Sequence, residues 1–454
     1  MRHHRAADSR LLLASAGFSC LAMVAFCACG EDVTHGASTE GDSGTVDAPA
    51  NLPDAAEAET PDASDGAPPF DPSNVPVECA GEPCVLELAA GFNHFCARMS
   101  DGRVQCWGAN DFGVLGTGAS PDNSNPDEVS DPTKPAVVTD LTDVVQISAA
   151  GNTTCAARKD RSVRCWGANA YGQLGLEADG GPQSDRDVHA YAIPVALGGA
   201  SAVRVDVGQR SACAVLVSGG LSCWGSNLNS QLARPTSEAV LGPGLADLSG
   251  FTVVRSSSSP YSTYAITPAG ELLSWGKLAG RYGSLDPDPV PAVIPSLDGV
   301  SDVSVGDSHT CAIAKGRVHC WGAGLYGALG TGLGSDAVLP MHAVMQTAAY
   351  AQQISVSRRT TCVRLTDGTV QCSGEAKWGQ LAIDPDADGE RIFALRQAAH
   401  FTDYAVQVMT SDASTCALLH NGTVKCWGSN EHGQLGQGKL DADPHPMPLT
   451  VTFR

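Results

Sequence analysis

The sequence predicts an all-β protein whose main part is an array of seven similar units of the β-propeller type. Three observations lead to this prediction. A unit with two spaced cysteines followed by Trp-Gly, or a degenerate version of it, recurs seven times between residues 77 and 454, about every 54 residues. Apolar and polar residues alternate around each cysteine, as half-buried strands require. The chain contains 50 glycines, about 11% of its 454 residues against roughly 7% in average proteins, which disfavours a helical array.

The charge and cysteine content exclude some classes of protein. The formal net charge is -21, with 28 Lys and Arg against 49 Asp and Glu. A basic nucleic-acid binder needs the opposite balance, because its cations contact phosphates. Seventeen cysteines are also many for a protein kept in a reducing compartment, so the composition favours an exported protein.

Residues 1–29 are predicted to be an export signal. Arg2, Arg5 and Arg10 precede an apolar run from Leu11 to Ala28, and polar sequence follows directly. A positive segment, an apolar segment and small residues near a cleavage point are typical of a secretory signal. The alternative is a single membrane-spanning anchor, since the run approaches the length that crosses a bilayer.

The end of this segment is a candidate lipidation site. Phe26-Cys27-Ala28-Cys29-Gly30 resembles the bacterial lipobox, in which a cysteine after a small residue is lipidated and becomes the mature N-terminus. Cys29 is the candidate, although Phe26 departs from the usual leucine. The alternatives are an outer-membrane or cell-surface lipoprotein, and simple cleavage that leaves a secreted or periplasmic protein.

Residues 30–76 are predicted to be a disordered acidic linker. This segment has no Lys or Arg and eleven acidic residues, and Ala, Gly, Ser, Thr and Pro make up most of the rest. Such a composition cannot bury enough apolar surface to offset its chain entropy. The segment is interpreted as a stalk that holds a domain off a membrane, or as a passive leader.

Residues 77–454 contain the seven repeats. Five are well formed: Cys96 to Gly108, Cys155 to Gly167, Cys213 to Gly225, Cys311 to Gly322 and Cys416 to Gly428. Two are degenerate, because Tyr264 to Gly276 has no cysteines and Cys362 to Gly374 has serine in place of tryptophan. The repeats reduce a three-domain estimate from length to one propeller.

Each unit is predicted to be a hairpin whose two cysteines face each other. In the first unit, Ser100-Asp101-Gly102 lies midway between the cysteines and fits a three-residue loop. Directly opposed positions are close enough for a disulfide. The predicted pairs are Cys96 with Cys106, Cys155 with Cys165, Cys213 with Cys223, Cys311 with Cys320, Cys362 with Cys372 and Cys416 with Cys426, preceded by Cys79 with Cys84.

Buried free thiols and a metal site are the alternatives to these disulfides. The fourth unit lacks both cysteines together, with Tyr264 and Ser274 in their places. The fifth unit is one residue shorter, and its loop shrinks to Lys315-Gly316, so its pair stays opposed. The short spacing of zinc ligands is absent from the hairpin pairs, and these observations favour disulfides.

The full repeat resembles that of the regulator of chromosome condensation family. The resemblance rests on the sequences from Ala89 to Gly116, Asn169 to Gly175 and Asn430 to Gly436, and it covers residues 77–454. It implies a seven-bladed propeller, monomeric, with four strands per blade. Residues 448–453 are then available to complete a blade with the N-terminal repeat.

The resemblance also implies roles for recurrent side chains. The repeat tryptophans are expected to pack between blades; they are Trp107, Trp166, Trp224, Trp275, Trp321 and Trp427. Trp378 aligns with Tyr171 instead. His94 and His309 precede a first cysteine by two residues, where other copies have Thr or Ser, and are expected to form hydrogen bonds rather than to act in catalysis.

No catalytic motif or cofactor site is recognisable, so the chain is predicted not to be an enzyme. Asp384-Pro385-Asp386-Ala387-Asp388-Gly389 matches the first half of a calcium loop, but Leu395 stands where the bidentate glutamate belongs. The alternatives are a solvated acidic loop and a weak calcium site, and no metal is assigned.

The predicted function is protein binding by an exported, membrane-anchored propeller that contacts the membrane only through its lipid. Variable loops above a rigid scaffold favour binding; they are residues 119–135, 177–193 and 384–391. Inhibition of a secreted enzyme such as a hydrolase is the alternative. Guanine-nucleotide exchange, the activity of the family's founding member, conflicts with the export signal, and a glycan-active propeller lacks assignable paired carboxylates.

Overall fold

The computed structural model describes residues 75–118, 131–178, 181–182, 184–236, 238–277, 288–333, 338–344, 349–384 and 389–453. All of them lie in one compact unit that spans residues 58–454. The predicted signal with Cys29, and the linker up to residue 74, lie outside the described residues. Within the described part, no helix is long and apolar enough to cross a membrane.

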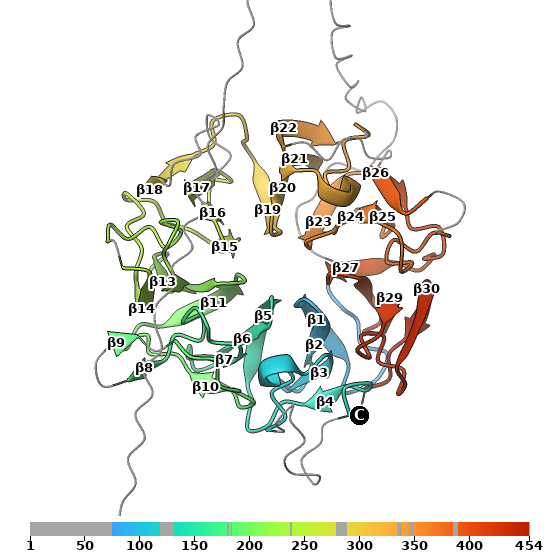
Figure 1. Ribbon diagram of the computed structural model, residues 1–454, viewed down its shortest axis with the longest axis horizontal. Coiled ribbons are helices and arrows are strands. Elements are labelled where there is room, and N and C mark those ends of the chain that lie inside the picture. Colours follow the sequence, from blue (N-terminus) through green and yellow to red (C-terminus); the bar gives the residue numbers. More distant parts are fainter. Residues whose placement is uncertain are drawn as a thin grey trace, which may run out of the picture. The chain divides into compact units, whose positions relative to one another are not determined.

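The unit is a seven-bladed β-propeller, as the repeat count predicts. Each blade is a four-stranded antiparallel sheet, and Figure 1 shows the seven sheets arranged around a central axis. In every blade the four strands follow one another in sequence and in space, with the first strand next to the axis and the fourth at the rim.

The inner strands of most blades have six residues, although β15 (Arg255–Ser258) has four, β16 (Ser262–Ile266) five and β5 (Val144–Ala150) seven. The first strands are β1 (Val85–Ala90), β5 (Val144–Ala150), β11 (Ala202–Val207), β15 (Arg255–Ser258), β19 (Val300–Val305), β23 (Ala351–Val356) and β27 (Ala405–Thr410). The second strands are β2 (His94–Met99), β6 (Thr153–Arg158), β12 (Ser211–Leu216), β16 (Ser262–Ile266), β20 (His309–Ala314), β24 (Thr360–Leu365) and β28 (Ser414–Leu419).

The outer half of each blade is less uniform. The third strands are β3 (Val104–Gly108), β7 (Val163–Gly167), β13 (Leu221–Ser226), β17 (Leu272–Gly276), β21 (Arg317–Ala323), β25 (Val370–Glu375) and β29 (Val424–Asn430). The fourth strands are β4 (Ala136–Val137), β10 (Ile193–Pro194), β14 (Val240–Leu245), β18 (Asp288–Val293), β22 (Val338–Val344), β26 (Arg391–Gln397) and β30 (Asp441–Thr450). A small hairpin, β8 (Glu177–Ala178) with β9 (Gly181–Pro182), and two 3-10 turns, η2 (Asp111–Gly113) and η4 (Leu325–Gly327), complete the described elements.

The second and third strands form the predicted hairpins. Cys96 is directly opposite Cys106, and the pair keeps this register in the other cysteine-bearing blades. In the fifth hairpin, Lys315 and Gly316 have φ of 50° and 77°, so a two-residue turn with both residues left-handed replaces the longer loop. The turn length therefore compensates for the missing residue and preserves the cysteine pairing.

The hydrophobic core is divided among the seams between blades. The described residues form seven apolar clusters, and each cluster combines residues of two adjacent blades. For example, Val104 and Leu115 of blade 1 pack with Ile147 and Trp166 of blade 2. A blade thus buries both faces of its sheet only when it has a neighbour on each side, which makes the closed ring the stable unit.

The expectation that residues 448–453 complete a blade with the N-terminal repeat is wrong. β30 pairs with β29 of its own repeat, and blade 1 already has four strands of its own. The ring closes by packing instead: the edge of Phe453 meets the Trp107 ring at 5.5 Å between centroids, and Val77 packs against the same cluster. Backbone bonds from Glu78 and Ala80 to the turn after β28 join the start of the described chain to blade 7.

Candidate functional site

The two ends of the propeller carry different connections. One end, which we call the loop face, holds the turns between first and second strands and the loops between third and fourth strands. The opposite end, which we call the hairpin face, holds the turns between second and third strands. The variable loops singled out from the sequence all join third to fourth strands and therefore belong to the loop face. Their residues 119–130, 179–180, 183 and 385–388 lie outside the described part of the chain.

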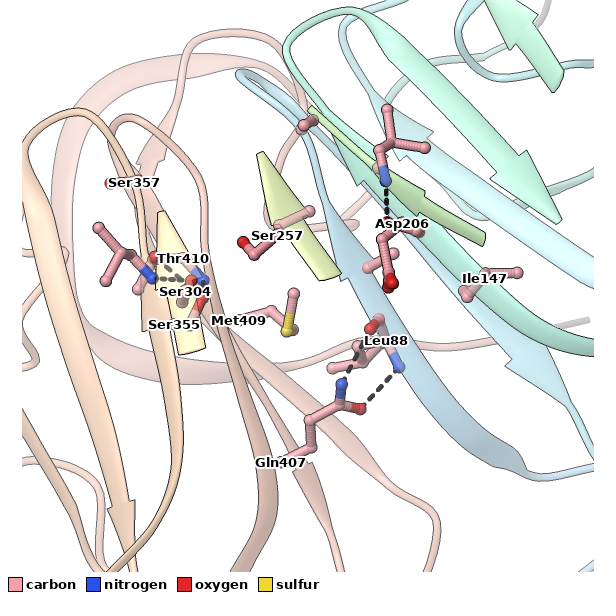
Figure 2. Close-up of a pocket in the computed structure, with 18 of the residues that line it drawn as sticks. Leu88, Ile147, Asp206, Ser257, Ser304, Ser355, Ser357, Gln407, Met409 and Thr410 are labelled. Atoms are coloured by element: carbon pink, nitrogen blue, oxygen red, sulfur yellow. Dashed lines mark hydrogen bonds between the residues drawn. The ribbon is translucent and has the colours of Figure 1, made fainter. Parts of the chain in front are cut away.

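A cavity of about 510 Å³ lies on the propeller axis and is lined mainly by the first strands. Figure 2 shows Ser257 and Met409 pointing into it from opposite sides. Hydroxyl groups are common on its wall, but several accept bonds from a neighbouring blade: Ser148 Oγ from Val207 N and Ser355 Oγ from Thr410 N, each at 3.0 Å.

The strongest polar groups of the cavity wall are also engaged within the protein. Gln407 accepts from Leu88 N at 2.8 Å and donates to Leu88 O at 3.0 Å, which Figure 2 shows as two dashed lines. Gln353 bonds in the same way to Val408 in the next blade. These side chains connect adjacent blades, so the polar groups of the cavity wall contribute to the stability of the propeller.

Charged groups on the cavity wall form pairs. Arg98 contacts Glu87 at 3.0 Å and Arg204 contacts Asp206 at 2.6 Å, while Arg255 of blade 4 forms an ion pair across the seam with Asp302 of blade 5. Burial raises the pKa of Glu87, and Arg98 opposes that shift. Because each of these three arginines has a carboxylate partner, the cavity wall offers little uncompensated charge to a ligand.

A cluster of charged residues surrounds the cavity mouth on the loop face. Arg358 lies 3.9 Å from Asp307, and the neighbouring Arg359 contacts Glu375 at 2.9 Å. Burial raises the pKa of Asp412 to about 6, and the charge of Asp307 acts in the same direction. The mouth therefore holds two carboxylates from blades 5 and 7 that interact through two arginines of blade 6.

A second pocket, of about 330 Å³, lies beside this mouth across blades 1, 2 and 3. Three aromatic side chains line it, Phe92, Phe112 and Tyr171, together with Arg186 and Arg210. The Arg210 guanidinium lies over the Tyr171 ring, 4.8 Å from its centroid. Phe112 has φ of 59° and a side chain 38% exposed, so a bulky residue occupies the left-handed region and still faces solvent.

The two histidines take the structural role expected for them. His94 Nε2 contacts Thr154 Oγ1 and His309 Nε2 contacts Thr361 Oγ1, each at 2.9 Å and each across a seam. Both rings are buried, and burial lowers their pKa to about 4. They are therefore neutral at physiological pH and bind one blade to the next.

The repeat tryptophans also lie in the seams, as expected. Trp166 donates from its indole Nε1 to Val114 O of the preceding blade at 2.8 Å. Trp107, Trp224, Trp275 and Trp427 donate to the carbonyl at the equivalent position of their preceding blades. Trp378 is placed differently and carries Lys377 over its ring at 4.7 Å.

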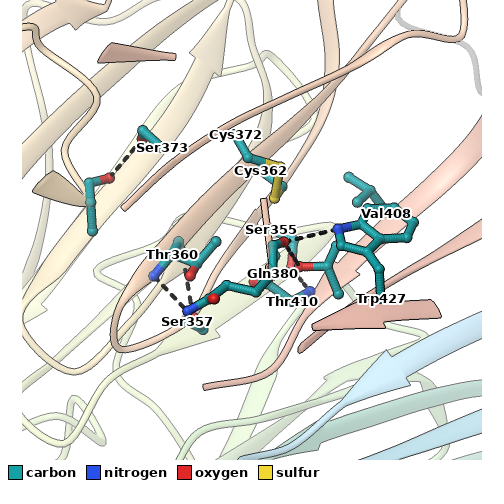
Figure 3. The surroundings of a disulfide bond; sticks show 12 residues. Ser355, Ser357, Thr360, Cys362, Cys372, Ser373, Gln380, Val408, Thr410 and Trp427 are labelled. Atoms are coloured by element: carbon teal, nitrogen blue, oxygen red, sulfur yellow. Dashed lines mark hydrogen bonds between the residues drawn. A yellow bond between two sulfur atoms is a disulfide. The ribbon is translucent and has the colours of Figure 1, made fainter. Parts of the chain in front are cut away.

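The structure joins the sulfur atoms of all seven predicted cysteine pairs, including Cys79 with Cys84. In the six hairpins the two Cα atoms are 4.1–4.2 Å apart. Figure 3 shows the Cys362–Cys372 bond near the seam where Trp427 donates to Gln380 O. The hairpin cysteines are therefore buried within the sheets and form part of the scaffold.

The calcium interpretation of residues 384–389 stays a prediction, because most of the motif lies outside the described residues. Within the described residues, no group of three or more His, Cys, Asp or Glu side chains is placed to hold a metal ion. Asp384 contacts His400 at 3.1 Å, and residues 385–388 of the motif lie outside the described part.

The side chains of the second pocket and of the mouth cluster were not identified from the sequence. Arg210, Asp307, Arg358 and Asp412 all occupy turns between first and second strands, two or three residues after a first strand ends. The repeat alignment contains a signal for them, because these turns carry a charged residue in blades 3, 5, 6 and 7. The sequence does not show that these four residues lie close together around one axis, because this depends on how the seven blades are arranged.

Comparison with known proteins identifies the repeat. The model described as "Regulator of chromosome condensation (RCC1) repeat" matches residues 85–114, 144–173 and 406–434, and a second model of the same description matches residues 101–157. The chain is thus a seven-bladed propeller with RCC1-type repeats, in agreement with the resemblance seen in the sequence.

Similar proteins differ widely in the share of their own length that the matched region covers. The ultraviolet-B receptor UVR8 of Arabidopsis thaliana is 29% identical over 368 residues, which cover 78% of this chain and 79% of the receptor. The human E3 ubiquitin-protein ligase HERC2 is 26% identical over 366 residues, which cover 76% of this chain but only 7% of the ligase.

Solved structures agree on the fold. Prp20p from Saccharomyces cerevisiae, whose structure was reported with its binding properties to Gsp1p and histones, gives a TM-score of 0.64 at 16% identity over 82% of this chain and 88% of that one. Yeast RCC1 (Prp20) bound to Kap60 gives 0.64 at 15% identity, over 84% and 88%. Proteins with propellers of this repeat thus include ones that bind other proteins.

Proposed function

We propose that this chain is an exported, non-catalytic protein-binding module that binds its partner on the loop face. The observation that carries the proposal is the distribution of side chains. The polar groups of the central cavity bond to neighbouring blades, whereas the loop face gathers aromatic rings, arginines and the longest loops. Binding residues concentrate on loops above a rigid scaffold, and Tyr, Trp and Arg dominate protein interfaces.

The cellular setting is part of the same proposal. Seven disulfide pairings in one propeller favour an oxidising compartment. Residues 1–29 supply the export signal, Cys29 the lipid, and residues 30–76 the stalk of a monomeric propeller whose only membrane contact is the lipid. The relatives named above come from a plant, human and yeast, so this setting rests on the sequence of this chain alone.

Site-specific photo-crosslinking in the producing cell tests the binding face. A photoreactive phenylalanine analogue replaces Phe112 on the loop face or, as the matched control, Val217 in the turn after β12 on the hairpin face, which is 62% exposed. We expect a discrete cross-linked protein from position 112 and none from 217. Equal labelling from both positions contradicts the assigned face, and the absence of any adduct contradicts protein binding.

The identity of the adduct also decides between a general module and an inhibitor. If the cross-linked partner is a secreted hydrolase, the full chain should lower its turnover at stoichiometric concentration, and the same chain with bulky substitutions on the loop face should not. If the partner is structural or regulatory, hydrolase activity should not change with added chain.

Labelling with an alkyne analogue of a fatty acid tests the anchor. The full chain should take up the label, and Cys29→Ser should lose it and appear in the medium. Label retained by Cys29→Ser contradicts lipidation at this residue, while an unlabelled, soluble wild-type chain supports simple secretion.

A further inference from the structure

The second pocket contains two arginines that differ from the two arginines of the mouth cluster. Arg358 and Arg359 each face a carboxylate, at 3.9 and 2.9 Å. Arg186 and Arg210 have no ion pair or side-chain hydrogen bond with any residue in the described part of the chain. At longer range, the Arg210 charge opposes the rise in the pKa of Asp307 that burial causes. Two guanidinium groups thus line a concave site without a bound carboxylate.

The aromatic residues of the pocket hold one of these cations in place. Arg210 lies over Tyr171, an arrangement that fixes the plane of the guanidinium and leaves its edge available. Because an ordered side chain loses less entropy on binding, the contact prepares Arg210 for a planar, bidentate acceptor. A carboxylate has this geometry.

Among the described residues that line the pocket, Asp185 is the one carboxylate, and it is already engaged. Asp185 Oδ1 contacts His189 Nε2 at 2.8 Å and Asp185 Oδ2 accepts from Asn169 Nδ2 at 2.9 Å. Burial alone would raise the pKa of Asp185, but the bonds from His189 and Asn169 hold it below its usual value. The Asp185 charge is therefore directed into the wall, which leaves the two arginines for an incoming group.

We propose that this pocket is the anchor point for an acidic segment of the protein partner, with a Glu or Asp carboxylate between Arg186 and Arg210 and an apolar neighbour on Phe92 and Phe112. The proposal rests on the proposed function and names the partner's chemistry. Polyanions such as nucleic acids fit less well, because the chain carries a net charge of -21 and repels an extended negative ligand. A single carboxylate beside an apolar side chain suits two guanidinium groups and three aromatic rings.

The test measures binding of labelled acidic peptides to the full chain, purified under oxidising conditions. The probe is an array of short peptides with one or two Glu or Asp residues beside Leu, Ile or Phe, and the control array replaces each acid with its amide. We expect binding of acidic members only, weakening as salt rises. Arg210→Gln should weaken binding about tenfold or more, and Arg186→Gln with Arg210→Gln about a hundredfold.

A matched variant separates this pocket from general charge effects. Arg358→Gln removes a cation from the same face, but one that already faces Asp307, and should change peptide affinity less than about threefold. Arg210→Lys keeps the charge but loses the planar fork, so its affinity should fall between the wild-type and Arg210→Gln values. Equal affinity of the wild type and every arginine variant, no binding by wild type, or equal binding of the amide array overturns the proposal.

Two further arms identify other occupants. The acidic residues of segment 30–76 are replaced by their amides in an otherwise full-length chain; if only this variant binds the peptides, the chain's own segment fills the pocket and the partner proposal is wrong. The Arg186→Gln/Arg210→Gln variant is also cross-linked through position 112. If it still captures the partner, the pocket proposal fails while the proposed function stands, and if wild type captures nothing, both fail.

Discussion

Blades 4 and 6 have each lost one of the two features that the other blades share. Blade 4 has no disulfide, because Tyr264 and Ser274 replace the cysteine pair, yet it keeps Trp275. Blade 6 keeps its disulfide, but Ser373 replaces the tryptophan. Because each blade retains the four-stranded sheet, the disulfide within a blade and the tryptophan between blades are separable contributions to stability.

The two losses are compensated differently. Tyr264 fills the space of the disulfide, and its hydroxyl accepts a hydrogen bond from Trp321 of blade 5 at 3.1 Å. Ser373 donates to Ala328 O at 3.4 Å, the carbonyl equivalent to the one that tryptophans reach elsewhere, but it is too small to fill the seam. The same seam between blades 5 and 6 holds the His309–Thr361 contact. A buried polar contact thus supports the seam that lacks an aromatic ring.

The largest expected effect comes from copying the blade 6 loss into an intact blade. Trp427→Ser in blade 7 removes a fully buried ring and its bond to Gln380, and should cost about 4 kcal/mol of unfolding free energy. Chemical denaturation followed by far-ultraviolet circular dichroism measures it. A loss below about 1 kcal/mol would mean that tryptophan is not needed to stabilise a seam.

Removing a disulfide should have the next largest effect. The double variant Cys213→Ala/Cys223→Ala removes the disulfide of blade 3, which joins two residues ten positions apart. It should lower the free energy of unfolding by about 3 kcal/mol under oxidising conditions. With reductant present throughout, wild type and variant should differ only by the lost packing of two small side chains. Equal stability under oxidising conditions would instead support buried free thiols in this blade.

Measuring the free energy of unfolding against pH should reveal the seams that contain His94 and His309. In the folded protein, His94 and His309 have a pKa lowered to about 4 and stay largely neutral at pH 5, whereas both are protonated in the unfolded chain. Acid therefore favours the unfolded chain, and the folding stability that is present above about pH 6.5 is lost as the pH falls toward 4. From pH 7 to 5 each histidine should cost about 2 kcal/mol.

The variant His309→Gln provides the control for this titration. It should reduce the loss of stability between pH 7 and pH 5 by about 2 kcal/mol, and His94→Gln should reduce it by a similar amount. Asp412 titrates with the opposite sign, because its raised pKa favours the folded state below about pH 6, and it is common to all the proteins compared. A loss of stability with acid that is identical in wild type and both variants would contradict the assignment.

The smallest effect is expected from the compensating hydroxyl of blade 4. Tyr264→Phe keeps the ring and leaves the Trp321 indole N–H without its acceptor, at a cost of about 1 kcal/mol. Thermal unfolding under fixed redox conditions measures the change. A gain in stability on this substitution would show that the bond with Trp321 is not the reason for the tyrosine.

Much of the frame was predictable from the repeat alone. The opposed cysteines and the short turn at Lys315 and Gly316 follow from spacing within one unit. The seam positions of the tryptophans follow from their recurrence in the repeats and from the family resemblance. The mode of ring closure was not predictable in this way, because the sequence of β30 is compatible with pairing either to its own repeat or to the first one.

The candidate binding site was less predictable for a physical reason. Arg210, Phe112 and Asp185 belong to three different blades, and their proximity depends on the rotation between successive sheets rather than on spacing along the chain. Arg210 is also distinguished because no described residue forms an ion pair with it, and only the assembled structure shows which cations are paired.

The way the ring closes also has a consequence for where the polypeptide starts. Each blade is one uninterrupted stretch of chain, so the contact between the last and first blades is of the same kind as the other six. Val77 and Phe453 pack against a single cluster, and a short linker would therefore join the two ends. A circularly permuted gene that opens the chain before Val144 should encode the same propeller, since the starting point belongs to the gene and not to the fold.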